Sequence, residues 1–177
     1  MKACISYVGS GRFLIFLLAV AILVGMAFGY FGGQLGGPLL DMLSDPAANE
    51  ARLAAMSADQ RSTHLLITLT LDVIYPIAYG GGFANLSARL VDRNKLLVAA
   101  PGLALILVDL TENVLIALML QGDAAVIPAK TLATQVKWWL FAGCSLLVTG
   151  LAIIAAIRHY TGGVAKSPIG GRASREI

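Results

Sequence analysis

Long apolar runs separated by short polar stretches dominate this chain. A helix that crosses the hydrocarbon core of a membrane needs about 20 apolar residues, and four of the runs are long enough. The pattern predicts transmembrane helices at about 13–31, 58–84, 100–120 and 136–157. The expected fold is therefore all-α: a polytopic membrane protein that forms an antiparallel bundle of four transmembrane helices within residues 1–160.

The first apolar run, which follows Lys2 and Arg12, is interpreted as a retained membrane anchor. A cleaved signal peptide would have a shorter apolar region of about 7–15 residues and a small-residue cleavage site. Small residues repeat every four positions along one face of the run: Ala21, Gly25, Gly29 and Gly33. Such a ladder lets another helix approach closely, so we expect this face to pack against a helix of the same chain or of a second copy.

The polar connection between the first two runs is expected to hold a short external helix. Asp45 before Pro46 is typical of an N-cap with proline at the first helical position, which predicts a helix over roughly 46–56. Ser57 and Gln60 have the spacing of a capping box, so the second transmembrane helix is expected to begin there.

Two further boundaries follow from composition. Pro101 suits the first turn of the third helix, because proline is tolerated where the backbone N–H has no partner. Residues 161–177 are rich in Gly, Ser and charge, which predicts a disordered cytoplasmic tail.

The composition agrees with a membrane protein, since 58% of the residues are hydrophobic and 13% are charged, against roughly 25% charged in soluble domains. The net charge of +3 is spread over the ends of the apolar runs, so no nucleic acid partner is expected. Cys4 and Cys144 have neither metal-ligand nor disulfide spacing. His64 and His159 fall at opposite ends of the bundle and are interpreted as interfacial. The sequence predicts no metal and no cofactor.

Most of the 13 Lys and Arg residues fall in the N-terminal segment, the second connection and the tail. Because cytoplasmic segments carry the excess of Lys and Arg, both termini are expected to be cytoplasmic. The predicted location is the bacterial inner (plasma) membrane, with the chain crossing it several times.

Three carboxylates remain inside the apolar runs: Asp72 in the second, and Asp109 and Glu112 in the third. An acidic side chain at the centre of a transmembrane helix costs about 2.5–3.5 kcal/mol on insertion scales. Such residues therefore face the interior of a bundle, where they mark a functional site or hold helices together.

Helical spacing groups these carboxylates with other polar side chains. One stripe of the second helix has the spacing i, i+4, i+7 and i+11: Thr68, Asp72, Tyr75 and Tyr79. One stripe of the third helix has the spacing i, i+3 and i+4: Asp109, Glu112 and Asn113. With a rise of about 1.5 Å per residue, the two stripes lie at similar depths, so we expect them to meet.

No Lys or Arg is expected inside a span to neutralise this group. Lys137 is placed near the outer interface, about two turns above Glu112. We therefore expect the carboxylates to share at least one proton or to hold a cation, and to act as one coupled site.

Three interpretations stay open for the site: a polar core that only holds helices together, a proton or cation site, and a site for a lipid-like or cationic ligand. The favoured function is a small non-enzymatic membrane protein. The alternative is an intramembrane enzyme that acts on a lipid or isoprenoid, with Asp109 or Glu112 as general acid or base. The expected partners are the lipid bilayer and a second copy or another membrane protein.

Two stretches, LDVIYPIAY at 71–79 and VDLTENVL at 108–115, resemble a group of small, uncharacterised bacterial four-helix membrane proteins. Their second helix carries D-x-x-[YF]-P-x-x-Y and their third helix carries D-L-x-E-N. The resemblance implies the same four-helix membrane fold and brings no known activity. The residues that match the two motifs are Asp72, Tyr75, Pro76, Tyr79, Asp109, Glu112 and Asn113.

Overall fold

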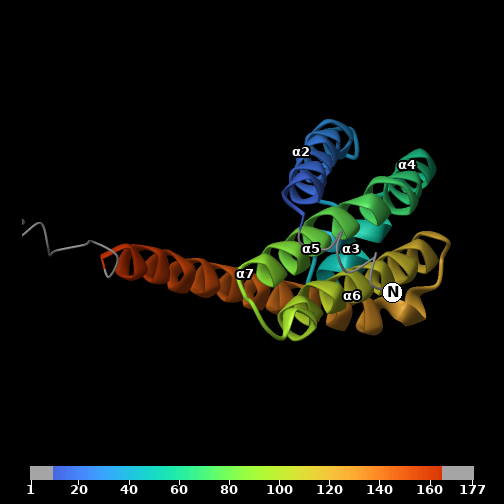
Figure 1. Cartoon of the computed structure of the whole chain (residues 1–177). Coiled ribbons are helices and arrows are strands. Elements are labelled where there is room, and N and C mark those ends of the chain that lie inside the picture. The colour runs from blue at the N-terminus through green and yellow to red at the C-terminus, as the bar shows by residue number, and fades with distance from the viewer. Residues whose placement is uncertain (1–9, 165–177) are drawn as a thin grey trace, which may run out of the picture.

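The computed structural model describes residues 10–164, which are helical with no strands among them (Figure 1). Cys4 and most of the predicted tail lie outside the described residues. The elements in chain order are α2 (Gly11–Gly33), η1 (Leu40–Met42), α3 (Pro46–Ala55), α4 (Ala58–Leu69), α5 (Leu71–Arg89), α6 (Lys95–Leu120), η2 (Ala124–Val126) and α7 (Ile127–Val164).

Within the described residues, four helical stretches are long and apolar enough to cross a membrane, in agreement with the four predicted runs. They are Gly11–Gly33, Ala58–Arg89, Lys95–Leu120 and Ala124–Thr161.

Two of the predicted starts were too late. α6 begins at Lys95 after Asn94, whose left-handed backbone (φ 56°) ends the preceding turn, so Pro101 lies inside the helix and not in its first turn. α7 begins at Ile127, and Pro128 occupies its first turn. The early start of α7 places the lysines at its N-terminal end within the helix, which changes the site described below.

The caps of the short helices agree with the sequence. The Asp45 carboxylate accepts a hydrogen bond from the Ala48 N–H at 2.8 Å and caps α3. Ser57 and Gln60 form both bonds of the capping box at the start of α4.

The second span was predicted as one helix, but it is divided at Thr70, where the backbone (φ −119°, ψ −77°) separates α4 from α5.

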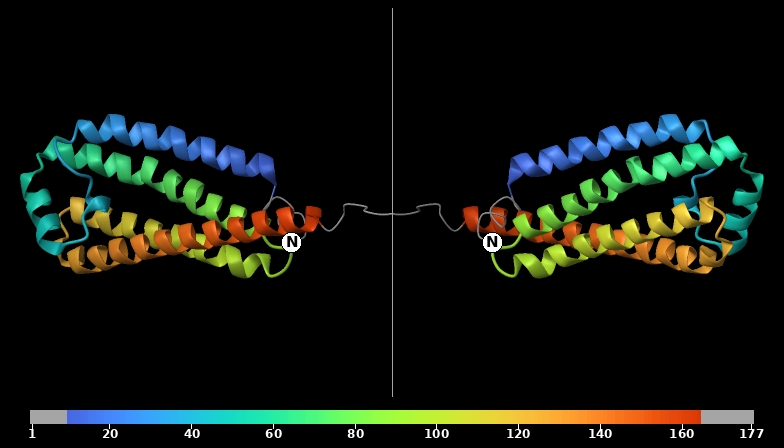
Figure 2. Two further views of the ribbon diagram at one scale, coloured as in Figure 1. Left: turned by 90° about the vertical axis from the view of Figure 1, so that its left-hand side faces the viewer. Right: turned by 90° about the vertical axis from the view of Figure 1, so that its right-hand side faces the viewer.

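Figure 2 shows α2, the α4–α5 pair, α6 and α7 running lengthwise beside one another, each opposite in direction to the one before. α3 and both 3₁₀ turns lie at one end, and the start of α2 and the end of α7 lie toward the other end. α5 is central to the packing, because it contacts α6, α2 and α7, and α6 in turn packs against α7.

α5 and α6 approach most closely through small residues. A Cβ built at Gly102 would lie 2.7 Å from both the Gly80 carbonyl oxygen and the Ala84 nitrogen, so no side chain fits there. Ala84, Ala88 and Ala99 form a buried cluster beside this crossing. Small residues thus bring two helix backbones together in this pair.

The predicted ladder on α2 meets a neighbour at one glycine only. A Cβ at Gly25 would lie 4.0 Å from the Tyr75 ring, whereas nothing in the described part of the chain comes within 4 Å at Gly29 or Gly33. Ala21 is half-buried. Close packing along the whole face therefore stays a prediction for a second copy or another partner.

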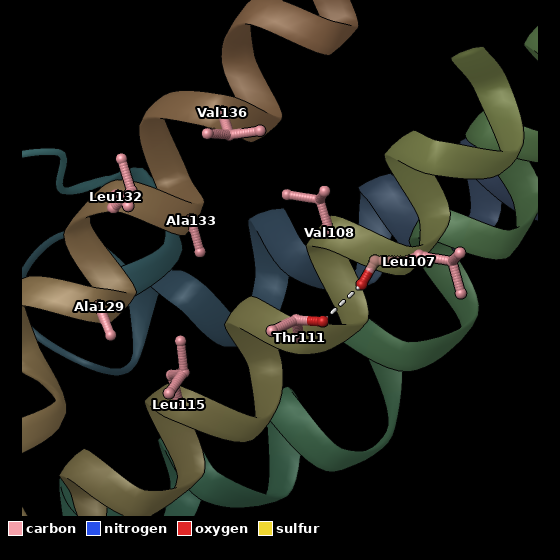
Figure 3. Close-up of a pocket in the computed structure, with 8 residues that line it drawn as sticks. All are labelled: Leu107, Val108, Thr111, Leu115, Ala129, Leu132, Ala133 and Val136. Carbon is pink, nitrogen blue, oxygen red and sulfur yellow. Dashed lines mark hydrogen bonds between the residues drawn. The ribbon is translucent and has the colours of Figure 1, made fainter.

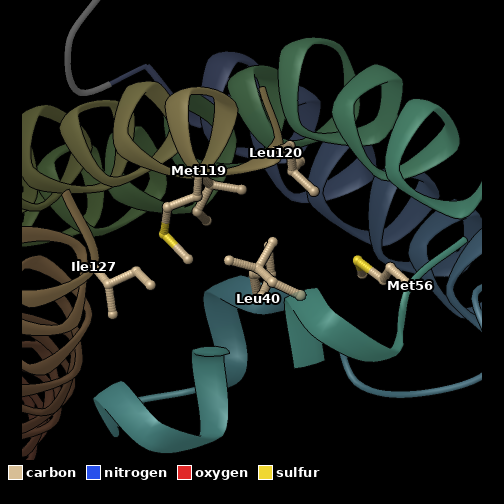
Figure 4. Packing of buried hydrophobic residues seen from close by; sticks show 7 residues of the cluster. Leu40, Met56, Met119, Leu120 and Ile127 are labelled. Atoms are coloured by element: carbon tan, nitrogen blue, oxygen red, sulfur yellow. The ribbon is translucent and has the colours of Figure 1, made fainter. Parts of the chain in front are cut away.

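The end of the molecule that carries α3 is closed by a segment we call the cap segment, residues 35–56. Its apolar side chains pack onto the ends of α6 and α7 (Figure 4). The buried cluster consists of Leu40, Leu53, Met56, Ile116, Met119, Leu120 and Ile127. Burial of each such side chain contributes about 1.5–3 kcal/mol, so the cap segment belongs to the core.

Candidate functional site

A cavity of about 260 Å³ lies beneath the cap segment, between α5, α6 and α7. Its walls combine carboxylates, one lysine and aromatic rings. The lining residues are Asp41, Met42, Asp72, Tyr75, Tyr79, Asp109, Lys137, Trp138 and Phe141. Four of the seven predicted site residues therefore share one cavity: Asp72, Tyr75, Tyr79 and Asp109.

Asp109 lies in the wall formed by α6 and is buried. The Tyr79 hydroxyl donates a hydrogen bond to its Oδ2 atom. The other oxygen, Oδ1, lies 3.8 Å from the Lys137 Nζ atom and accepts no hydrogen bond from any of the described residues. Oδ2 therefore has a hydrogen-bond donor, whereas Oδ1 has only the lysine ammonium 3.8 Å away.

Glu112, one turn further along α6, is fully buried beside the cavity and is held by α7. The Thr134 hydroxyl donates to Oε1 at 2.5 Å, and Lys137 Nζ lies 2.5 Å from Oε2. Lys130 Nζ lies 3.8 Å from Oε1. The expectation of a group without a counter-charge was wrong, because α7 starts nine residues before position 136 and carries both lysines into the bundle.

Lys130 connects the cap segment to α7. Its fully buried ammonium donates hydrogen bonds to the Leu40 carbonyl, to the Leu43 carbonyl at 2.7 Å and to Asn49 Oδ1 at 3.1 Å. An ammonium has three N–H donors, and these three acceptors use them all. Lys130 therefore holds the cap segment in place and leaves Glu112 mainly to Lys137.

Asn113 repairs a gap in the backbone of α5. Pro76 has no N–H, so the carbonyl of Asp72, four residues before it, lacks its helical donor. The Asn113 side chain donates to that carbonyl oxygen at 2.5 Å. Asn113 thus joins α6 to α5 next to the cavity but does not line it.

Among the four carboxylates in or beside the cavity, Asp72 is the one whose side chain makes no hydrogen bond or ion pair within residues 10–164, and it is only 5% exposed. Its charge is repelled by Asp41, Asp109 and Glu112 and attracted by Lys137. A buried carboxylate that lacks donors favours either a proton or a cationic ligand.

Thr68 and His64 lie apart from the cavity, in α4. The Leu40 N–H donates to His64 Nε2 at 3.0 Å, and His64 Nδ1 lies 3.2 Å from the Thr68 hydroxyl. A nitrogen that accepts carries no proton, so His64 is neutral and its Nδ1–H faces Thr68. His64 is 1% exposed and helps to fix the cap segment, so its side chain faces the protein at this end of the bundle; its depth relative to the membrane surface stays a prediction.

Aromatic rings form a continuous wall on one side of the cavity. The centroid distances are 5.1 Å for Tyr75–Tyr79, 5.8 Å for Tyr79–Phe141 and 5.9 Å for Trp138–Phe141, all edge to face. Lys137 Nζ lies 5.8 Å from the Trp138 ring centroid, within the range of a cation–π contact. Ring faces and carboxylates thus surround the same space.

The site contains more acidic than basic groups. With Asp41, Asp72, Asp109 and Glu112 ionised, four negative charges would face the two positive charges of Lys130 and Lys137. No group of three or more metal-ligating side chains close enough to hold an ion occurs among the described residues. The cavity and its surroundings therefore carry an excess of acidic side chains.

A second, larger hollow of about 530 Å³ lies on another face of α6 and α7 (Figure 3). It is lined by Leu107, Val108, Thr111, Leu115, Ala129, Leu132, Ala133 and Val136. The Thr111 hydroxyl, its only polar side chain, donates to the Leu107 carbonyl at 2.8 Å. This hollow is an apolar groove without polar chemistry.

The residues that sequence reasoning missed come mainly from α7. They repeat at i, i+4, i+7 and i+11, the same spacing that grouped the α5 residues: Lys130, Thr134, Lys137 and Phe141. This spacing is visible in the sequence, but the predicted fourth helix began at 136, which left Lys130 and Thr134 outside the helix. Asp41 comes from a 3₁₀ turn, where periodicity gives no signal.

Comparisons of the chain with models of protein families, with curated proteins and with solved structures gave no match.

Proposed function

We propose that this chain is an antiparallel four-helix protein of the bacterial inner membrane that binds a cation in the acidic cavity and has no enzymatic activity. Both termini lie in the cytoplasm, and the cap segment lies on the outer side. The membrane fold is supported by the four spans.

The orientation is supported by the distribution of Lys and Arg residues between the two ends of the bundle. Arg52 Nε and Nη2 donate to the Pro38 and Leu35 carbonyls at 2.9 and 2.8 Å, and Arg61 donates to the Leu53 carbonyl at 2.6 Å. These two arginines, Lys130 and Lys137 are the four basic residues of the described chain toward the α3 end, against five toward the other end: Arg12, Arg89, Arg93, Lys95 and Arg158. At the opposite end, the Lys and Arg residues flank the helix ends, as in cytoplasmic loops.

Labelling of single cysteines tests this orientation. In a Cys4→Ser/Cys144→Ser background, Glu50→Cys and Asp92→Cys place exposed thiols at the two ends. An impermeant maleimide added to intact cells should label position 50 and miss position 92 until the membrane is permeabilised. Labelling of position 92 alone would reverse the orientation.

The single observation that carries the binding function is Asp72, a buried carboxylate that borders a 260 Å³ cavity and receives no hydrogen bond from the part of the chain that the structure describes. A carboxylate that serves only as a link between helices would make hydrogen bonds, as Glu112 does. Asp72 instead lies where a cation would supply the missing charge.

Thermal unfolding of the purified protein tests cation binding, because a ligand that binds only the folded state raises the melting temperature with its concentration. Series of inorganic and organic chlorides, compared at constant ionic strength, should include one that stabilises wild type. Asp59→Asn, at an exposed carboxylate of α4, should behave as wild type, and Asp72→Asn should lose the effect. Equal melting temperatures in every salt for all three proteins would contradict the proposal.

An intramembrane enzyme is the second candidate, and one observation favours it. The cavity is bordered by side chains that are also exposed on the surface: Met42, Trp138 and Phe141. A lipid could reach the carboxylates past them. Asp109, with its free Oδ1, is then the acid or base, because Glu112 is held by Thr134 and Lys137. Turnover of a membrane lipid that is lost in Asp109→Asn would establish this function.

A further inference from the structure

We propose that the cation in this cavity is an organic ammonium group with an apolar substituent. The inference rests on the cation-binding function proposed above and specifies the chemical class of the ligand.

The size of the cavity favours an organic group. A water molecule takes up about 30 Å³, and pockets for small molecules begin at about 300 Å³, so 260 Å³ holds a group of several heavy atoms. A bare metal ion would leave most of this volume empty. It would also lack ligands, since no cluster of three metal-binding side chains occurs in residues 10–164.

The walls provide what an ammonium group binds. Tyr75 and Tyr79 on α5 and Trp138 and Phe141 on α7 present rings to the same space. Aromatic rings attract alkylammonium groups through their negative faces and accommodate attached methyl groups. Metal ions gain less from such a wall, because they require oxygen, nitrogen or sulfur ligands at short distance.

The charges leave one carboxylate for the ligand. Lys137 lies 2.5 Å from Glu112 and 3.8 Å from Asp109, and no lysine or arginine nitrogen in the described chain lies within 4.0 Å of Asp72. The protein's own cation thus pairs with Glu112. An ammonium group that enters the cavity would pair with Asp72, with Asp109 Oδ1 as a second acceptor.

The exposed border of the cavity accounts for the apolar substituent. Met42 is 55% exposed, Trp138 43% and Phe141 37%, so the border is apolar and continues onto the outer surface of α7. An ammonium group inside the cavity would leave its substituent against these side chains. Two sources share this chemistry: a free amphiphilic amine and the headgroup of a membrane lipid.

Ligand-observed NMR with choline and ethanolamine tests the class of ligand. The protein is placed in nanodiscs of phosphatidylglycerol, and saturation transfer from the aromatic protons of the protein to the probe is measured. We expect transfer to at least one probe that NaCl at equal ionic strength does not abolish. Asp72→Asn should weaken binding at least tenfold.

Two neighbouring tryptophans provide a matched pair of variants. Trp138→Leu removes a ring from the cavity wall and should weaken binding about two- to fivefold, the effect of one ring on a cation. Trp139 is 80% exposed and does not line the cavity, so Trp139→Leu should bind as wild type. Equal effects of the two substitutions would overturn the aromatic contact and the proposal with it.

A second nanodisc series, which contains phosphatidylcholine or phosphatidylethanolamine, separates the two sources. Probes that bind in phosphatidylglycerol and are excluded by the second series identify a lipid headgroup; probes that bind equally in both identify a free amine. Stabilisation by Na⁺ or K⁺ without binding of either probe would overturn this inference and leave cation binding intact. No effect of any cation would overturn both.

Discussion

The two halves of the α5–α6 pair are built on opposite principles. Toward the α5–α6 loop, Gly80 and Gly102 bring the backbones so close that a Cβ would lie 2.7 Å from a carbonyl oxygen. Toward the cap segment, the same helices are joined by polar contacts, Tyr79 to Asp109 and Asn113 to the Asp72 carbonyl, beside a cavity. The comparison shows how one helix pair can combine a rigid crossing with an open site.

Lys130→Met should give the largest effect, because it removes a buried cation from the cap half. The Leu43 carbonyl and Asn49 Oδ1 would lose their donor, and Glu112 would lose one of two nearby cations. Removing one partner of a buried ion pair costs about 3–5 kcal/mol. Reversible unfolding in detergent measures this loss. A loss below about 1 kcal/mol would show that water replaces the ammonium.

Gly102→Val tests the glycine crossing of α5 and α6. It should lower the free energy of unfolding by about 1–3 kcal/mol or more, because overpacking a close contact forces the backbones apart. Gly143→Ala in α7 is the control, since a Cβ there meets nothing within 4 Å. Unfolding of both variants in the same detergent provides the comparison. Unchanged stability of Gly102→Val would mean that α5 and α6 are not in close contact.

Asn113→Leu should cost about 1–3 kcal/mol, the penalty for a buried carbonyl without a donor. Restoring the backbone N–H with Pro76→Ala supplies a helical donor to the Asp72 carbonyl. The double variant should therefore recover part of the loss, which a double-mutant cycle on unfolding free energies would show as a coupling of at least about 0.5 kcal/mol. If the two substitutions change the unfolding free energy additively, the role of Asn113 does not depend on the missing N–H of Pro76.

Gly29→Leu should have the smallest effect on the isolated chain, less than about 0.5 kcal/mol, because no described atom lies within 4 Å of its built Cβ. The same variant reports on a second copy. Size-exclusion chromatography of wild type and variant should show a smaller assembly for the variant if this face of α2 packs against a partner. A large loss of stability without a change in size would indicate a contact inside the chain.

The sequence predicted the spans because hydrophobic length and helix-cap chemistry are local properties. Asp45 and Ser57 form the bonds that their spacing indicated. Asp72, Tyr75 and Tyr79 line one cavity, because side chains four and seven residues apart share a helix face.

The sequence reasoning failed where burial depends on tertiary partners. Lysine is polar on every hydropathy scale, so the hydropathy pattern does not place Lys130 inside a transmembrane helix. It is buried because backbone carbonyls of the cap segment accept hydrogen bonds from its ammonium. His64 is buried by the same segment. The regular glycine ladder of α2 predicted a packing face, but no such repeat marks Gly102 in α6, whose close contact becomes visible only beside Gly80.

The bonds of Lys130 also impose an order on biosynthesis. Leu40 and Leu43 of the cap segment are synthesised 90 and 87 residues ahead of Lys130, to which their carbonyls bind. Its carbonyls can therefore bind Lys130 only after α6 and the start of α7 have been synthesised. The last helix to enter the bilayer is thus the one that closes the site.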